Sequence, residues 1–168
     1  MIFTDLIKTG FKVQGRNKEF VWLPLTLRKY GEFVKWVQYL PYHEAKENNL
    51  PKKTQDNILS KCQTGQVIEK TIPDDWPDDK KVKDEDLIEK KFDIHLGSSC
   101  VSEMFFTAKG LAKLLQLGLS ISYPEMNEII LDQEIDTENQ GIAIKEIQDA
   151  MMKQEEEIGK NELSPNQN

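Results

Sequence analysis

The stretch Leu27-Arg-Lys-Tyr-Gly-Glu-Phe-Val-Lys-Trp-Val-Gln-Tyr-Leu40 carries its apolar side chains at helical spacing. A helix that begins after the capping residue Thr26 gathers them on one broad face. Because this face extends so far around the helix, we expect more than one element to pack against it. Pro41 lacks a backbone N–H group and is expected to end or kink the helix. The apolar residues of this face are Leu27, Tyr30, Phe33, Val34, Trp36, Val37 and Leu40.

Short elements flank this helix on both sides. Residues 11–23 alternate apolar and polar side chains around Gly15-Arg-Asn-Lys18, which predicts a β-hairpin. Thr107 is expected to cap one helix, and capping boxes at Ser122-Tyr-Pro-Glu125 and Thr137-Glu-Asn-Gln140 are expected to open two more. With the weaker patterns included, we expect helices over 54–68, 87–92, 101–105, 111–119, 124–134 and from 137 onward.

Together these elements predict a mainly α fold of the α+β class, a compact irregular helical bundle with a short N-terminal β-hairpin. The length of 168 residues suits a single domain over residues 1–157. Residues 73–86 hold seven acidic residues, three lysines and two prolines, and are expected to form an exposed, mobile loop. The chain becomes polar after Glu157, so residues 158–168 are expected to form a disordered tail.

Composition and charge exclude several classes of function. The chain has 22 lysines and arginines against 29 acidic residues, which gives a net charge of −7. Such a chain lacks the positive surface that binds nucleic acid, so we expect no nucleic-acid partner. The most apolar segment, residues 111–121, is too short to span a membrane, and no membrane partner is expected. Cys62 and Cys100 fit reduced thiols better than a disulfide framework.

No motif for catalysis, metal binding or cofactor binding is complete, so we expect neither an enzyme nor a cofactor. The segment His43-Glu-Ala-Lys-Glu47 lacks the second histidine of the zinc protease pattern. Residues 132–138 alternate acidic side chains as a calcium loop does, but the required glycine and glutamate are missing. His95 lies close in sequence to Cys100, so a Cys–His pair stays open beside a purely structural role.

Residues 109–134 superficially resemble a helix-turn-helix unit. No lysine or arginine occurs between Leu114 and Ile144. Repulsion from the phosphate backbone therefore argues against DNA binding. The second helix, residues 124–134, carries the acidic residues Glu125, Glu128, Asp132 and Glu134.

Two stretches resemble a known family. One is Phe20-Val-Trp-Leu-Pro-Leu-Thr-Leu-Arg-Lys-Tyr-Gly-Glu-Phe33, in which a strand runs into a helix. The other is Gly110-Leu-Ala-Lys-Leu-Leu-Gln-Leu-Gly-Leu-Ser-Ile-Ser-Tyr-Pro-Glu-Met126, an apolar helix that closes with a Pro-Glu turn. In pattern and order, residues 11–150 are similar to the small tail assembly chaperones of long-tailed bacteriophages. The acidic insertion at residues 73–86 departs from that pattern.

This resemblance implies a non-catalytic protein that acts in the host cell cytoplasm. Its implied partner is the tape measure protein, a long helical protein that such chaperones keep soluble until the tail tube forms around it. Two alternatives stay open. One is a structural virion protein, such as a connector, a head–tail completion protein or a tail accessory protein. The other is a small module that binds a host protein.

The candidate partner-binding residues are apolar and lie in the C-terminal half of the chain. Methionine adapts to irregular apolar surfaces, which suits such a role. The alternative is that residues 144–152 pack on the core of the domain itself, as we also expect for one ring of the Phe105-Phe106 pair. The edge of the N-terminal hairpin offers a route to a homo-oligomer, with a simple lid as the alternative. The candidates are Phe106, Ile144, Ile147, Met151 and Met152.

Overall fold

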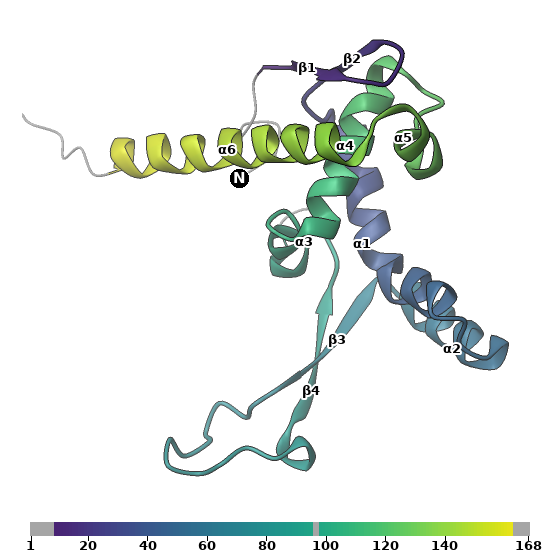
Figure 1. The fold of residues 1–168 in the computed structure, drawn as a ribbon. Helices are drawn as coiled ribbons and strands as arrows, with labels where there is room; N and C mark the ends of the chain where they lie inside the picture. Colours follow the sequence, from purple (N-terminus) through teal and green to yellow (C-terminus); the bar gives the residue numbers. More distant parts are fainter. Residues whose placement is uncertain (1–8, 96–97, 163–168) are drawn as a thin grey trace, which may run out of the picture.

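The computed structural model describes residues 9–95 and 98–162. A helical head carries three projections: the paired helices α1 and α2, the hairpin β3–β4, and the long helix α6 (Figure 1). In chain order the elements are β1 (Phe11–Gln14), β2 (Glu19–Trp22), α1 (Leu27–Glu47), α2 (Lys52–Cys62), β3 (Gln66–Thr71), the 3-10 turn η2 (Asp84–Asp86), β4 (Ile88–Asp93), α3 (Ser99–Met104), α4 (Ala108–Ser122), α5 (Glu128–Glu134) and α6 (Thr137–Glu162). The mainly helical α+β class and the N-terminal hairpin are as the sequence predicts.

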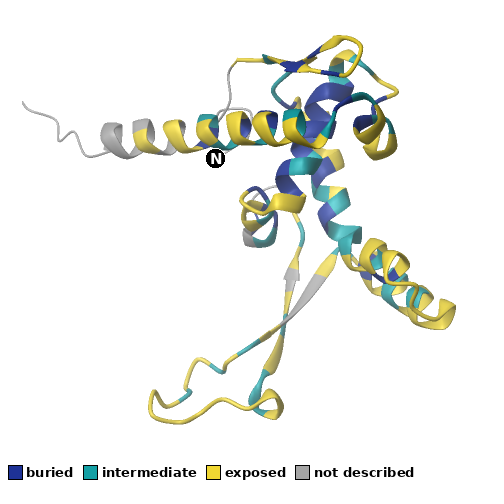
Figure 2. Ribbon diagram, viewed as in Figure 1, coloured by how far each residue is buried: buried dark blue, intermediate teal, exposed yellow. Residues whose placement is uncertain are grey.

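Helix α4 lies at the centre of the head. It is apolar around most of its circumference, as expected of a helix that is enclosed on several sides. It contacts β2, α1, α3 and α6, and it forms the main dark-blue segment of Figure 2. Thr107 caps it by accepting a hydrogen bond from the backbone N–H of Gly110 at 3.0 Å, as the sequence predicts. Its buried residues are Gly110, Leu111, Leu114, Leu115, Gln116, Leu117, Gly118, Leu119 and Ser120.

Trp22 fixes the N-terminal hairpin to α4. The indole is fully buried, and its Nε1 donates a hydrogen bond to the carbonyl of Leu114 at 3.0 Å. The ring lies directly on Gly118, where no side chain intervenes. On its other side it stacks on Phe11, with the ring centroids 5.0 Å apart. The hairpin is therefore part of the core and not a detachable strand pair.

Helix α1 begins at Leu27, and the Thr26 side chain accepts a hydrogen bond from the backbone N–H of Lys29, as predicted. Tyr30, Phe33 and Val37 are buried, and the Phe33 ring stacks on Phe105 of the α3–α4 turn. The helix continues through Pro41 to Glu47, so of the two expected effects of the proline, an end or a kink, the end is wrong. Proline removes a single backbone donor, and burial of Ala45 holds the next turn in place.

Two predicted helices are partly or wholly strands. The helix expected over 54–68 ends at Cys62, and the chain turns at Gly65 into β3. The helix expected over 87–92 is the strand β4, which pairs antiparallel with β3. These segments are short, and their pairing is non-local, so local periodicity does not reveal it. The acidic segment 73–86 lies in the connection between the two strands and ends with the 3-10 turn η2.

The boundaries of the last two helices differ from the predictions. Ser122 ends α4 instead of opening a helix, and Asn127 caps α5 by accepting a hydrogen bond from the N–H of Ile130. Helix α6 begins at Thr137 as expected, but the carboxylate of Asp136 accepts the hydrogen bond from the N–H of Asn139. Helix α6 extends to Glu162, so the predicted disordered tail is helical over 158–162, and the residues beyond lie outside the described ones.

Candidate protein-binding site

The predicted stripe on α6 divides between the core and the surface. Ile147 and Met151 are 0% and 1% exposed, and Ile144 is half-buried against the same core. These three side chains hold α6 on the head, in contact with α4. The alternative that the stripe packs on the core of the domain is therefore the correct one for these positions. They are not available to a partner in this structure.

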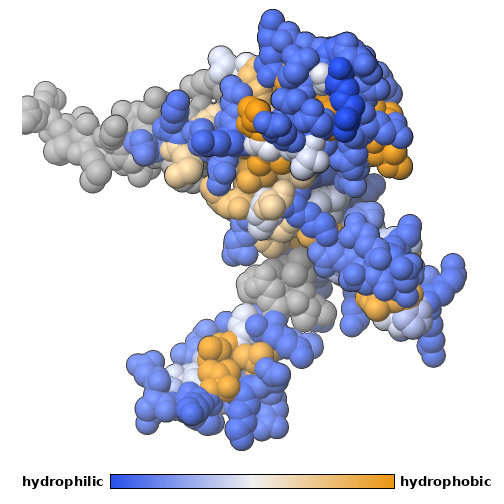
Figure 3. All heavy atoms as spheres, viewed as in Figure 1, coloured by the Kyte–Doolittle hydropathy of each residue, from blue (hydrophilic) through white to orange (hydrophobic). Residues whose placement is uncertain are grey.

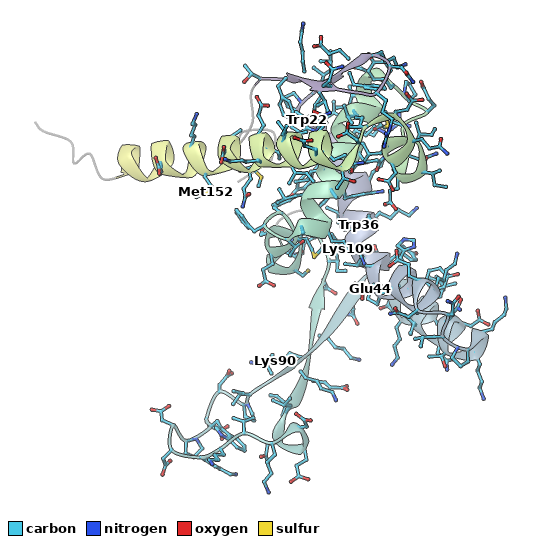
Figure 4. The ribbon with its side chains drawn as sticks, viewed as in Figure 1. Trp22, Trp36, Glu44, Lys90, Lys109 and Met152 are labelled. Carbon is cyan, nitrogen blue, oxygen red and sulfur yellow. The ribbon has the colours of Figure 1, made fainter. Side chains whose placement is uncertain are left out.

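Two predicted residues remain at the surface. Phe106 is 50% exposed beside the buried Phe105, as expected of one ring of that pair. Met152 is 53% exposed on the projecting part of α6 (Figure 4). The two residues lie on separate elements, because Phe106 is in the turn between α3 and α4. Each is an exposed apolar side chain, and single side chains of this kind are common on soluble domains.

A groove that the sequence does not reveal lies beside Trp36, and we call it the Trp36 groove. It has a volume of about 490 Å³ and lies between the second half of α1, α4, α5 and the first turn of α6. A second hollow of about 500 Å³ shares Trp36, His43 and Lys113 with it. Trp36 is half-buried, and its ring packs on Phe33 with centroids 5.6 Å apart. The apolar part of the lining is Trp36, Leu40, Ala112 and Leu131.

Antiparallel packing of α1 and α4 builds this groove. At one end, Nζ of Lys109 lies 3.4 Å from Oε1 of Glu44 and 3.6 Å from Oε2 of Glu47. Further along α4, Nζ of Lys113 lies 5.9 Å from the centroid of the Trp36 ring. Figure 4 shows Lys109 of α4 close to Trp36 and Glu44 of α1. The earlier lysine of α4 therefore contacts the later part of α1, and the later lysine contacts its middle, so the two helices are antiparallel.

The charges on the rim of the Trp36 groove are mixed and largely paired. Lys113 also reaches α5, where its Nζ lies 3.4 Å from Oε1 of Glu128. Two more charged residues line the groove, Lys46 on α1 and Asp132 on α5. Exposed pairs such as those of Lys109 with Glu44 and Glu47 contribute little to stability, about 0–1 kcal/mol each, so a partner can replace them at small cost. An apolar floor inside an exchangeable charged rim is typical of a surface that binds protein.

Within the described chain, no group of three or more histidine, cysteine and acidic side chains lies close enough to hold a metal ion. Burial raises the pKa of the Cys62 thiol, which keeps it protonated near neutral pH and makes it a poor nucleophile. The Sγ of Cys100 lies 3.2 Å from the hydroxyl of Ser98. No described helix has an apolar run long enough to cross a membrane.

A sequence signal for the Trp36 groove exists in retrospect. Lys109 and Lys113 are one turn apart, as are Glu44 and Glu47, and complementary charges at helical spacing indicate two helices that pack together. Trp36 and Leu40 widen the apolar face of α1 beyond the buried positions of that helix. Only the structure shows that none of the described elements covers this extra width completely. Neither a family model, nor a curated protein, nor a solved structure matches the chain.

Proposed function

We propose that this protein is a non-catalytic tail assembly chaperone of a long-tailed bacteriophage, and that it binds the tape measure protein during tail assembly. The resemblance of residues 20–33 and 110–126 to that family suggests the role. The observation that carries the proposal is the Trp36 groove, an apolar depression between helices with a charged rim. A groove of this kind suits the apolar side chains of an amphipathic helix from a partner.

The binding mode follows from the lining of the groove. An apolar side chain of the partner helix packs on Trp36 and Leu40 and is removed from water, which supplies most of the affinity. Polar residues on the flanks of that helix exchange with the ion pairs of Lys109 and Lys113. Because the contact area is small, the complex is reversible, as a chaperone that leaves the finished tail requires. The net charge of −7 limits aggregation of the loaded complexes.

Co-expression with the tape measure protein of the same genome tests this proposal. The wild-type protein is expected to raise the soluble fraction of the tape measure protein and to co-purify with it. Leu40→Asp places a carboxylate on the apolar floor of the groove, where the apolar side chain of a partner would pack, and is expected to abolish both effects. Leu27→Asp is the matched control, because Leu27 is 61% exposed on the same helix and does not line the groove.

The result that would overturn this proposal is equal rescue by the wild-type protein and by Leu40→Asp, provided that circular dichroism shows both proteins to be folded. A structural virion protein is the second candidate, and the projecting β3–β4 hairpin favours it because such arms suit contacts between subunits (Figure 1). Mass spectrometry of purified particles separates the two functions. Abundant copies in the virion support the structural role, and absence or trace amounts support the chaperone.

A further inference from the structure

The hairpin β3–β4 and its connection form an arm, residues 66–93, that stands away from the head (Figure 1). Its two strands pair with each other, from Gln66 opposite Asp93 to Thr71 opposite Ile88, and form a separate two-stranded sheet. An isolated two-stranded hairpin is marginally stable in water. A partner that binds the outer end of the hairpin therefore also stabilises the pairing of the two strands.

The outer end of the arm carries an apolar patch. Ile72, Val82 and Ile88 are 48%, 41% and 41% exposed, although each is a large aliphatic side chain. Figure 3 shows an apolar cluster near the end of the arm, surrounded by hydrophilic atoms. Ile88 begins β4, Ile72 directly follows β3, and Val82 comes from the connection. We call these three residues the arm patch.

The connection that presents the arm patch holds several contacts of its own. Trp76 donates a hydrogen bond from Nε1 to the carbonyl of Lys80 at 3.0 Å. The ammonium group of Lys80 lies 4.0 Å from the centre of the Trp76 ring. The backbone N–H of Lys83 donates to the carboxylate of Asp86 at 3.1 Å and closes the 3-10 turn. The surface is thus largely formed before a partner arrives, which lowers the entropic cost of binding.

Negative charge surrounds the arm patch. Glu89 follows Ile88 directly, and residues 73–86 hold seven acids against three lysines. In the described part of the arm, ion pairs join Lys90 to Asp74 at 3.0 Å and Lys83 to Glu85 at 3.7 Å. The remaining excess of carboxylates repels nucleic acid and anionic lipid surfaces. It attracts a cationic segment whose apolar side chains can cover the patch.

We propose that the arm is a second binding surface, separate from the Trp36 groove, and that it binds a lysine- and arginine-rich amphipathic helix of another protein. The apolar stripe of that helix covers Ile72, Val82 and Ile88, and its flanking cations face the carboxylates. A helix suits this site because residues three and four apart gather several aliphatic side chains into one compact stripe. The net charge of −7 opposes a second copy of the same chain as the occupant.

A peptide of leucine and lysine designed to form an amphipathic helix tests this proposal by fluorescence anisotropy with the full-length protein. A peptide of the same composition in scrambled order controls for charge alone. Ile72→Ser is expected to weaken binding of the amphipathic peptide by about tenfold, since it removes apolar area from the contact. Ile129→Ser is the matched control, because Ile129 is 70% exposed on α5 and lies outside the arm.

Charge is tested with a pair of variants of equal net charge. The double variant Asp75→Asn and Asp84→Asn removes two exposed carboxylates from the arm. It is expected to bind the amphipathic peptide more weakly than the wild type, and added salt is expected to change its affinity less. The double variant Glu146→Gln and Asp149→Asn removes two exposed carboxylates from α6, and is expected to leave binding within about twofold of the wild type.

Three results overturn the proposal. The first is equal affinity for the scrambled and amphipathic peptides, which would mean that charge alone attracts them. The second is unchanged binding by the Ile72 and arm-charge variants, which would place the site elsewhere. The third is a dimer of the free protein, seen by light scattering, that Ile72→Ser dissociates, which would make a second copy the occupant. None of these measurements involves the tape measure protein, so they succeed or fail independently of the proposed function.

Discussion

At the scale of single residues, the contact between Trp22 and Gly118 joins the N-terminal hairpin to α4. Trp22 ends the N-terminal hairpin, and Gly118 lies in the middle of α4. A Cβ atom at position 118 would lie 2.0 Å from Nε1 of Trp22, well inside contact distance. The same Nε1 donates to the carbonyl of Leu114. The absence of a side chain at Gly118 therefore positions the indole for its hydrogen bond.

Gly118→Ala is expected to destabilise the protein, although alanine is the better helix former. The added methyl group displaces a buried indole, and overpacking of this kind costs about 1–3 kcal/mol. Gly141→Ala is the matched control, because Gly141 also lies in a helix and has no atom within 4 Å of the added Cβ. It is expected to stabilise the protein by about 0.5–1 kcal/mol. Urea unfolding measures both, and destabilisation by both variants would contradict this account.

At the scale of elements, local signals in the sequence identify the helices of the head but not the arm. The cap at Thr26 and the cap at Thr107 act within a few residues, so their helices begin where the sequence indicates. Strand β4 depends instead on pairing with β3 across the acidic connection, and no local pattern encodes that partner. The Trp36 groove is equally non-local, because its lining comes from α1, α4, α5 and α6.

Helix α6 shows why an apolar stripe alone does not identify a binding face. Ile147 and Met151 are buried on the head, whereas the next residue, Met152, is 53% exposed. Ile147→Ala and Met151→Ala are therefore each expected to lower the free energy of unfolding by about 2–5 kcal/mol. Met152→Ala is the control and is expected to stay within about 0.5 kcal/mol of the wild type. Thermal unfolding followed by circular dichroism measures all three.

Equal, small effects at the three positions would mean that α6 is not held on the head in solution. In that case the stripe of Ile144, Ile147 and Met151 would again be available to a partner, as one of the two sequence-based interpretations holds. Large effects at Ile147 and Met151 alone would leave Phe106 and Met152 as the exposed members of the predicted set. The stability measurement therefore decides between the two interpretations without knowledge of the partner.

At the scale of the whole molecule, the core and the acidic surface occupy different parts of the chain. The buried cluster is built from β1, β2 and the helices of the head, whereas the acidic connection lies at the end of the arm. The ends of the arm are joined by a backbone hydrogen bond from the N–H of Ile94 to the carbonyl of Gly65 at 2.8 Å. The arm is therefore attached to the head at one point and is separable from its core.

Replacement of residues 66–93 by a short glycine–serine turn is expected to leave the head folded. The side chains of the arm that the structure describes contribute none of the buried core residues, and the neighbours of the arm, Gly65 and Ile94, are joined by a backbone hydrogen bond. The midpoint of thermal unfolding is expected to change by less than about 4 °C, the shift that about 1 kcal/mol produces in a domain of this size. Loss of a cooperative transition would show instead that the arm is part of the folding unit. A folded, armless protein that still makes the tape measure protein soluble but no longer binds the cationic helix would show that the Trp36 groove and the arm patch act independently.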